Sequence, residues 1–297
     1  MPLATALNRV FGLFGVKFAR SATVERLEGE LRSEQSRRGE LEAERQKSFL
    51  VPMDYDYACR PRPQSHLFQA IADIIERDRE RIEQFLKSLR PIMHGPQIGR
   101  IPLEKRFDDE PYWNNPYLMP ADSRIIYAVA AHYQPKTIIE VGSGNSTKFF
   151  RQAIRDHNLK TTLISIDPEP RAEIGKISDR IINRSVLDVE PAFFDVLQAG
   201  DVLFIDGSHL VFNGTDIVYL ILEVLPRLQP GVLIHIHDIF LPWEYTEQFT
   251  KRGYAEQYIL GALLVGSDKW KVLAPVHYLG ETGAHEKHGG SFWIVRD

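Results

Sequence analysis

The sequence has one cysteine, no long apolar run and no strong excess of charge of either sign. Cys59 is the only cysteine in 297 residues, which excludes an intramolecular disulfide and a cysteine-rich zinc site. No run approaches the ~20 apolar residues needed to span a bilayer, so no transmembrane segment is expected. Lys and Arg total 36 against 40 Asp and Glu, and this balance offers no global attraction to nucleic acid. The composition is typical of a globular cytoplasmic protein without a nucleic-acid partner.

The first 50 residues are dominated by charge. From Ser21 to Lys47 both signs occur without proline, which predicts a solvated helix. We interpret residues 1–50 as a helical arm, either a short coiled coil that pairs subunits in a homo-oligomer or a plain charged helix. The apolar stretch Val10–Val16 can make weak peripheral membrane contact, although Gly12 and Gly15 favour packing against protein. Four residues form an interrupted heptad-like seam: Val24, Leu27, Leu31 and Leu41.

Residues 51–120 are predicted to form a linker and a helical cap region. Prolines and tyrosines crowd Val51–Pro63, a composition that breaks helices. Ser65 then caps a helix whose apolar residues follow the 3.6-residue period to Leu89, and which ends before Pro91. Four side chains are candidates either for a wall over a substrate or for simple packing: Trp113, Asn114, Tyr117 and Trp243.

From Lys136 onward, short β-branched runs alternate with helical stretches. This alternation predicts βαβ units and a Rossmann-like, mostly parallel α/β sheet with helices on both faces. We expect this domain at residues 121–297, with Trp270–Tyr278 and Ser291–Val295 as an antiparallel C-terminal strand pair that has no helix between its members. The other strands are expected at Thr137–Val141, Thr161–Ile166, Arg180–Ser185, Asp201–Ile205 and Val232–His237, and the helices at Thr147–Asp156, Pro191–Gln198 and Ile217–Leu225.

A glycine loop follows the first predicted strand, where an open α/β sheet binds nucleotide-like ligands. Gly142 and Gly144 let the backbone approach a ligand, and Ser146 can cap the next helix. Glu140 precedes the loop and Asp167 ends the second strand. The loop lacks the third glycine of the usual NAD-binding motif, and the carboxylate of Glu140 would repel the pyrophosphate of NAD. The methionine end of S-adenosylmethionine is cationic, so a nearby carboxylate favours it. The residues therefore favour the methyl donor as cofactor.

Five segments of the chain resemble class I S-adenosylmethionine-dependent methyltransferases, and more closely a bacterial branch similar to small-molecule O-methyltransferases. They are IIEVGSGNSTKFF, ISIDPEPRAEI, DVLFIDGSHLVFNGTD, LEVLPRLQPGVLIHIHDIFLPWEY and GGSFWIVRD, and the resemblance covers roughly Tyr112–Asp297. It implies transfer of a methyl group to a hydroxyl of a small molecule or sugar. It also implies a cofactor site in which Glu140, Gly142 and Gly144 hold the methionine end, Asp167 holds the ribose, Leu187 and Asp188 hold the adenine, and Ser143, Asn145, Ser146 and Asp206 complete the site. Asp188 has an alternative interpretation as a helix cap before Pro191.

Two clusters of polar residues follow the fourth and fifth predicted strands. Asp206 and His209 come after one, and His237 and Asp238 end the other, so they should meet at the carboxyl edge of the sheet. Methyl transfer to a hydroxyl requires alignment and removal of a proton, which makes His209 and His237 candidate bases with Asp238 beside them. The resemblance implies that Asp206 and Asp238 can instead hold Mg²⁺. His235 is expected to be a hydrogen-bonded core residue.

Two other classes of protein stay open at this point. One is an oxidoreductase or hydroxylase on a similar nucleotide-binding fold, and binding of NAD would distinguish it. The other is a non-catalytic adaptor that uses the helical arm and keeps the sheet as a scaffold, and failure to bind any adenosyl ligand would distinguish that one.

Overall fold

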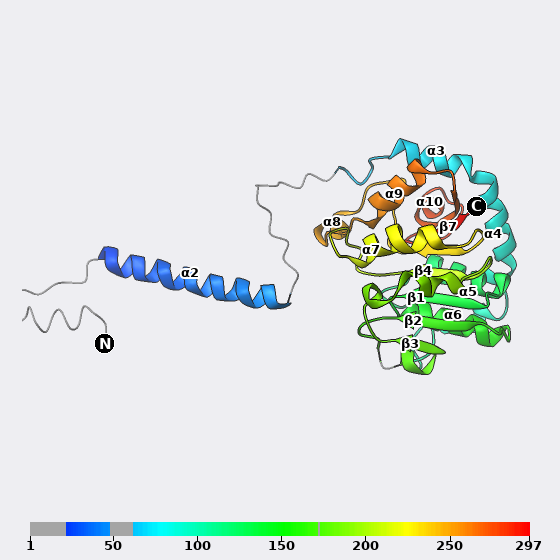
Figure 1. Cartoon of the computed structure of the whole chain (residues 1–297), viewed down its shortest axis with the longest axis horizontal. Helices are drawn as coiled ribbons and strands as arrows, with labels where there is room; N and C mark the ends of the chain where they lie inside the picture. Colours follow the sequence, from blue (N-terminus) through cyan, green and yellow to red (C-terminus); the bar gives the residue numbers. More distant parts are fainter. Residues whose placement is uncertain (1–21, 48–61, 172) are drawn as a thin grey trace, which may run out of the picture. The chain divides into compact units, whose positions relative to one another are not determined.

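A computed structural model of the chain divides into two compact units, residues 1–60 and 61–297 (Figure 1). The described part of the first unit is a single helix, α2 (Ala22–Lys47), which confirms the helix predicted for this stretch. Leu27 and Leu31 of the predicted seam are exposed on it. The apolar segment near the N-terminus and most of the predicted linker lie outside the described residues, which are 22–47, 62–171 and 173–297.

The second unit is built on one seven-stranded sheet in the order β3-β2-β1-β4-β5-β7-β6. Strands β1 to β5 run parallel, and β7 is antiparallel to both of its neighbours, β5 and β6. This arrangement confirms the predicted fold class, including the antiparallel C-terminal pair. The strands are β1 (Thr137–Val141), β2 (Thr162–Ile166), β3 (Arg180–Ile182), β4 (Val202–Ile205), β5 (Leu233–Ile236), β6 (Trp270–Pro275) and β7 (Phe292–Arg296).

The strand order reverses direction between β1 and β4, which are neighbours in the sheet (Figure 1). The chain moves outward from β1 through β2 to β3, then returns to β4 and moves the other way to β5. Right-handed crossovers therefore place α6 (Asn145–Asp156) and α7 (Asp216–Tyr219) on opposite faces of the sheet. The loops that leave β1 and β4 diverge at this point, and a crevice for a ligand is expected between them.

Apolar side chains cover both faces of the central strands. Phe149 and Phe150 of α6 and Phe204 of β4 are fully buried, and the rings of Phe150 and Phe204 meet edge to face with their centroids 5.4 Å apart. This packing fixes the strand ends from which the site is built. Among the helices that the structure describes, none has the length and apolar character required to cross a membrane.

The helix predicted from Ser65 to Leu89 is divided into two helices at Asp78. The Asp78 carboxylate is buried and accepts a hydrogen bond from the backbone N–H of Val272 in β6 at 2.8 Å, so the break ties the helical region to the sheet. The prediction that Ser65 caps the first helix is wrong, because this helix begins at Gln69. Between Ser65 and the helix, Leu67 forms an isolated β-bridge with Trp243. The second helix continues through Pro91 in its last turn. The two helices are α3 (Gln69–Arg77) and α4 (Arg79–Met93).

A helix also separates the two C-terminal strands, contrary to the prediction. The last three residues of the predicted strand Trp270–Tyr278 instead begin α10 (Val276–Glu281), because Pro275 has no N–H with which to continue the strand ladder. The segment predicted as the helix Pro191–Gln198 is a 3₁₀ helix, and Ile217–Leu225 changes from α to π to 3₁₀ geometry. The remaining elements are α5 (Pro120–Tyr133), α8 (Glu247–Lys251), α9 (Glu256–Gly266), η2 (Ile98–Arg100), η3 (Ile174–Lys176), η4 (Val186–Asp188), η5 (Pro191–Val196), η6 (Leu220–Val224) and η7 (Leu225–Arg227).

Candidate active site

The glycine loop passes directly against the end of β4. Gly142 has φ +81°, a left-handed conformation that favours glycine, and a Cβ there would lie 1.9 Å from the carbonyl oxygen of Asp206. The backbone N–H of Asp206 in turn donates to the carbonyl of Val141 at 2.9 Å. By contrast, a Cβ at Gly144 would meet no atom within 4 Å. Gly142 is thus needed for the close packing of the glycine loop against the loop that follows β4. At Gly144 the glycine loop has free space for a ligand.

Glu140 lies beneath this loop and is fully buried. Its carboxylate accepts hydrogen bonds from the hydroxyls of Ser146, Thr147 and Ser165. Burial raises the pKa of Glu140 to about 8, against the opposing effect of these hydroxyl donors. The prediction that Ser146 caps α6 is wrong, because its hydroxyl bonds Glu140 and the capping position belongs to Gly144. Glu140 therefore organises the loop from below, instead of presenting a free carboxylate at its surface.

Asp167 joins the second strand to the glycine loop, as its predicted position suggested. Its Oδ2 accepts hydrogen bonds from the backbone N–H of Ser143 at 2.9 Å and from the Ser143 hydroxyl at 2.7 Å. Its Oδ1 accepts from the backbone N–H of Glu169 at 2.8 Å. The carboxylate is only partly buried. Asp167 therefore lies within reach of a ligand on the loop while it holds the loop in place.

Other predicted cofactor residues lie on both sides of this loop. Asn145 is buried, and its side-chain amide donates a hydrogen bond to Asn115 Oδ1 at 3.0 Å. This bond holds the irregular segment before α5 against the start of α6. Leu187 and Asp188 lie in η4 beyond β3, where both are exposed. Leu187 lines a cavity of about 410 Å³ together with Tyr219. The alternative role of Asp188 as a cap is not observed, because η5 has no side-chain cap.

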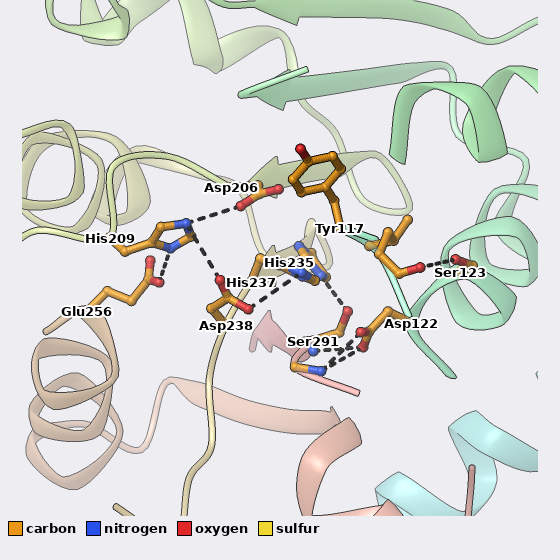
Figure 2. Close-up of polar contacts among 12 residues, drawn as sticks. Tyr117, Asp122, Ser123, Asp206, His209, His235, His237, Asp238, Glu256 and Ser291 are labelled. Atoms are coloured by element: carbon orange, nitrogen blue, oxygen red, sulfur yellow. Dashed lines mark hydrogen bonds and ion pairs between the residues drawn. The ribbon is translucent and has the colours of Figure 1, made fainter. Parts of the chain in front are cut away.

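The two predicted strand-end clusters meet, with His209 at their centre (Figure 2). His209 Nε2 lies 3.4 Å from Asp206 Oδ1 and 3.8 Å from Asp238 Oδ2. His237 Nε2 lies 3.7 Å from Asp238 Oδ1. On the opposite side of the His209 ring, Nδ1 forms a hydrogen bond with Oε1 of Glu256, a residue that sequence analysis did not identify. Four predicted residues and one further carboxylate thus form one polar cluster at the carboxyl edge of the sheet.

The charges of this cluster determine its protonation. Burial lowers the proton affinity of His209, but the neighbouring carboxylates, Glu256 foremost, outweigh burial and raise its pKa to about 9. Burial raises the pKa of Glu256 to about 7, against the effect of the imidazole. The pKa of His237 is raised by Asp206 and Asp238 against the effect of burial. His209 is therefore mostly protonated at neutral pH in the free protein.

Two residues of the cluster have left-handed backbone conformations that are uncommon for side chains with a Cβ. His209 has φ 61° and Asp238 has φ 53°. The backbone at Asp238 is packed closely against Gly290, where a Cβ would lie 3.3 Å from Asp238 Oδ1. Such conformations persist where surrounding contacts hold them, and they are concentrated at functional sites.

His235 is the hydrogen-bonded core residue that was predicted. Its ring is fully buried, stacks on Phe204 with centroids 3.8 Å apart, and Nε2 lies 2.8 Å from the Ser291 hydroxyl. Burial lowers the pKa of His235 well below its ordinary value, so the ring is neutral. The backbone N–H of Ser291 donates to the buried carboxylate of Asp122 at 2.8 Å, which anchors β7 to α5 below the cluster (Figure 2).

The predicted Mg²⁺ site at Asp206 and Asp238 stays a prediction, with substrate oxygens and waters as its other ligands. Among the described residues no third His, Cys, Asp or Glu side chain joins these two carboxylates in a group placed to hold a metal ion. The imidazole of His209 approaches both carboxylates through the same nitrogen atom. A protonated imidazole thus already supplies the positive charge between them.

The proposed aromatic wall does not form as one surface. Trp113 is buried against Phe149, with ring centroids 5.4 Å apart, so it belongs to the core around α6. Trp243 stacks instead on Tyr278 of α10, at 5.8 Å. Tyr117 is exposed and lies under the guanidinium of Arg171, which is 5.3 Å from its ring centroid. The remaining candidate, Asn114, bonds the side chain of Glu104. The packing alternative therefore holds for the two tryptophans.

Residues 139–239 match the model of a family described as a methyltransferase domain. The chain carries a methyltransferase domain. The match extends from β1 to just beyond β5, so this domain contains the glycine loop and both strand-end clusters. It confirms the family resemblance seen in the sequence and gives no support to an oxidoreductase or an adaptor.

Solved structures similar to this chain include three methyltransferases. The SAH-bound methyltransferase PaMTH1 of Podospora anserina is 13% identical with a TM-score of 0.40, over 84% of this chain and 99% of that one. The O-methyltransferase TomG from Streptomyces achromogenes, in complex with SAM, is 14% identical with a TM-score of 0.39, over 79% and 99%. An O-methyltransferase from Bacillus cereus, in complex with SAH, is 12% identical with a TM-score of 0.38, over 77% and 96%. No curated protein sequence matches this chain.

Proposed function

We propose that this protein is an S-adenosylmethionine-dependent methyltransferase that acts on a hydroxyl group of a small molecule, such as a sugar. The observation that carries the proposal is the meeting of two features across the β1–β4 switch point. One is a glycine loop bound to the acid Asp167, and the other is the His209 cluster, which touches the same loop through Asp206. A methyl donor held on the loop would therefore face a proton acceptor.

The residues of the loop fit S-adenosylmethionine better than a dinucleotide. The open space beside Gly144 and the partly exposed carboxylate of Asp167 suit an adenosyl ligand, with Asp167 on the ribose hydroxyls. Carboxylates at this edge favour the positively charged sulfonium and ammonium groups, and they would repel a pyrophosphate. Leu187 and Asp188, being exposed beyond β3, are assigned to the adenine, and Glu140 supports the methionine end indirectly through the loop hydroxyls.

His209 is the residue best placed to remove the acceptor proton. Its Nε2 faces the partly exposed side chains of Asp206 and Asp238, whereas Nδ1 is turned inward to Glu256. Bound S-adenosylmethionine would supply the methyl group to the acceptor oxygen, with the electron pair of the carbon–sulfur bond left on sulfur, and His209 Nε2 would take the acceptor proton. Asp206 and Asp238 stabilise the imidazolium that results. His237, whose Nε2 lies 3.7 Å from Asp238 Oδ1, is the second candidate base.

Binding of the cofactor is the first test of this function. Calorimetry with S-adenosylmethionine, S-adenosylhomocysteine and NAD should show binding of the first two only. A screen of hydroxylated sugars and aromatic compounds with labelled methyl donor then identifies the acceptor. Binding of NAD with no binding of either adenosyl ligand would overturn the proposal.

Several properties of the protein stay predictions. They are a cytoplasmic location, the lack of a nucleic-acid partner, weak peripheral membrane contact, and a homo-oligomer formed through the N-terminal helix. The division into residues 1–50, 51–120 and 121–297 is also a proposal. It is supported in part by the separation of the chain into two units at residue 60.

A further inference from the structure

Three consecutive residues hold His209 from one side of the cluster. The ring of Tyr254 stacks on the imidazole with centroids 4.2 Å apart and an interplanar angle of 22°. The backbone N–H of Ala255 donates to the carbonyl of His209 at 2.9 Å. Glu256, the first residue of α9, bonds Nδ1 of the ring. Together these contacts hold the backbone of His209, the plane of its imidazole ring and the Nδ1 side of that ring.

We propose that Glu256 is a positioning residue for His209, which directs Nε2 of the imidazole toward the acceptor. This inference rests on the proposed methyltransferase function and adds a residue to it. A neutral imidazole carries its proton on either nitrogen, and a carboxylate at one nitrogen selects the tautomer with the proton there. Glu256 forms the hydrogen bond at Nδ1, whereas the carboxylates at Nε2 lie 3.4 and 3.8 Å away, so Glu256 keeps the proton on Nδ1 and leaves the Nε2 lone pair free to accept one.

The burial of Glu256 supports a specific role. Its side chain is only 1% exposed, and Oε2 has no hydrogen-bond partner among the described residues. Removing a carboxylate from water is unfavourable unless a charged or hydrogen-bonding partner compensates. Its hydrogen-bond partner on the other oxygen, Oε1, is His209. The two residues thus form a buried pair in which each group stabilises the charged form of the other.

Glu256 also stabilises the imidazolium that forms when Nε2 takes the acceptor proton. The titratable groups that face the His209 ring are the carboxylates of Asp206, Asp238 and Glu256, the stacked phenol of Tyr254, and the imidazole of His237. The three carboxylates raise the pKa of His209. Glu256 has the largest of these effects and is the only one of the three that bonds Nδ1. Its removal should change both the tautomer and the proton affinity of the ring.

Nitrogen NMR of histidine-labelled full-length protein tests this role without an acceptor. The His209 resonances are assigned by their loss in His209→Gln. In the wild type, the neutral ring should carry its proton on Nδ1. In Glu256→Gln, which keeps the shape but removes the charge, the titration midpoint of His209 should fall by at least about one pH unit, a tenfold loss of proton affinity.

Glu244→Gln is a matched control. Glu244 is also buried, and its Oε1 accepts hydrogen bonds from Tyr258 and Gln257 near the start of α9, but its side chain does not bond His209. This variant should leave the His209 titration unchanged. A wild-type neutral ring with its proton on Nε2 overturns the proposal even if Glu256→Gln fails to fold, and so does an unchanged midpoint in folded Glu256→Gln.

Once an acceptor is known, the same variants separate positioning from binding. Glu256→Gln should lower kcat by about 10- to 100-fold, the usual effect of removing a group that orients a reactive imidazole, and should leave the affinity for S-adenosylmethionine nearly unchanged. Failure of the whole protein to bind S-adenosylmethionine would contradict the methyltransferase proposal but leave the NMR result intact. The two inferences therefore fail separately.

Discussion

Gly142 and Asp206 approach so closely that no side chain fits between them: a Cβ at position 142 would lie 1.9 Å from the Asp206 carbonyl oxygen. This contact joins the cofactor loop to the loop that carries His209. Alanine at position 142 must adopt a left-handed φ and must also push the end of β4 away. Backbone strain of this kind costs about 1–3 kcal/mol, and the steric overlap adds to it. Gly142→Ala should therefore lower the free energy of unfolding by more than about 2 kcal/mol in urea denaturation.

Gly144→Ala is the control for this effect. Its Cβ would point into open space, and its φ of 176° is extended backbone that any residue adopts. Unfolding should therefore be close to wild type, while a methyl group in the ligand space weakens binding of S-adenosylmethionine. Equal destabilisation by both alanines would contradict the asymmetry between the two glycines.

Asp167→Ala should weaken cofactor binding without unfolding the protein. Hydrogen bonds to a charged acceptor contribute about 1.5–3 kcal/mol, so calorimetry should show a loss of roughly ten- to a hundredfold in affinity. Part of this loss reflects the freed Ser143, which Asp167 holds through two hydrogen bonds. Asp195→Ala, which removes an exposed carboxylate paired with Arg227, should leave the affinity unchanged. Wild-type affinity in Asp167→Ala would remove Asp167 from the ribose site.

The sheet was predictable because its signals are local and periodic. Buried β-branched runs specify β1, β2, β4 and β5, and the alternation with helices specifies their parallel order. Breaks in elements were harder to predict, because they depend on distant partners. Asp78 divides a continuous apolar periodicity only because its carboxylate bonds the backbone of Val272, which is far away in sequence.

The same distinction applies to the site. Asp206, His209, His237 and Asp238 were predictable because parallel strands deliver their carboxyl ends to one edge. Glu256 was not, because an acidic residue at the start of an apolar helix is ordinary helix chemistry, and its contact with His209 requires the fold. The burial of Glu140 was likewise hidden, since the hydroxyls that surround it come from both α6 and β2.

The rate of methyl transfer should rise with pH and level off near pH 9. His209 can accept a proton only when neutral, and its pKa in the free protein is raised to about 9. Below that value kcat/KM should increase about tenfold per pH unit, because the neutral fraction does so. His209→Gln should lower turnover by about 10²–10⁴ and abolish this rise. A bell centred below pH 7 would indicate a different base.

Chelation should leave the activity intact. The carboxylates of Asp206 and Asp238 both face His209 Nε2, at 3.4 and 3.8 Å, so the protonated imidazole supplies the positive charge between them. Dialysis against EDTA should therefore not change turnover, and added Mg²⁺ should not increase it. Asp238→Asn should reduce turnover to the same degree with or without Mg²⁺. Loss of activity on chelation that Mg²⁺ restores would show that His209 moves aside for a metal and would sink this interpretation.

Removal of residues 1–60 should leave cofactor binding intact while changing assembly. The second unit begins at Pro61, and the glycine loop, Asp167 and the His209 cluster all lie within it. The cut must spare the residues that follow, because the backbone of His66 accepts a hydrogen bond from Glu244 and Leu67 bridges to Trp243.

Helix α2 exposes Leu27 and Leu31, which a second copy of the chain would cover in a homo-oligomer. Removal of α2 would therefore remove this contact between subunits. Sedimentation velocity should show a smaller species than the full chain, and Leu27→Glu with Leu31→Glu should reproduce the change. If the shortened chain fails to fold, the first 60 residues are part of the core; if it sediments as the same oligomer, the interface lies in the second unit.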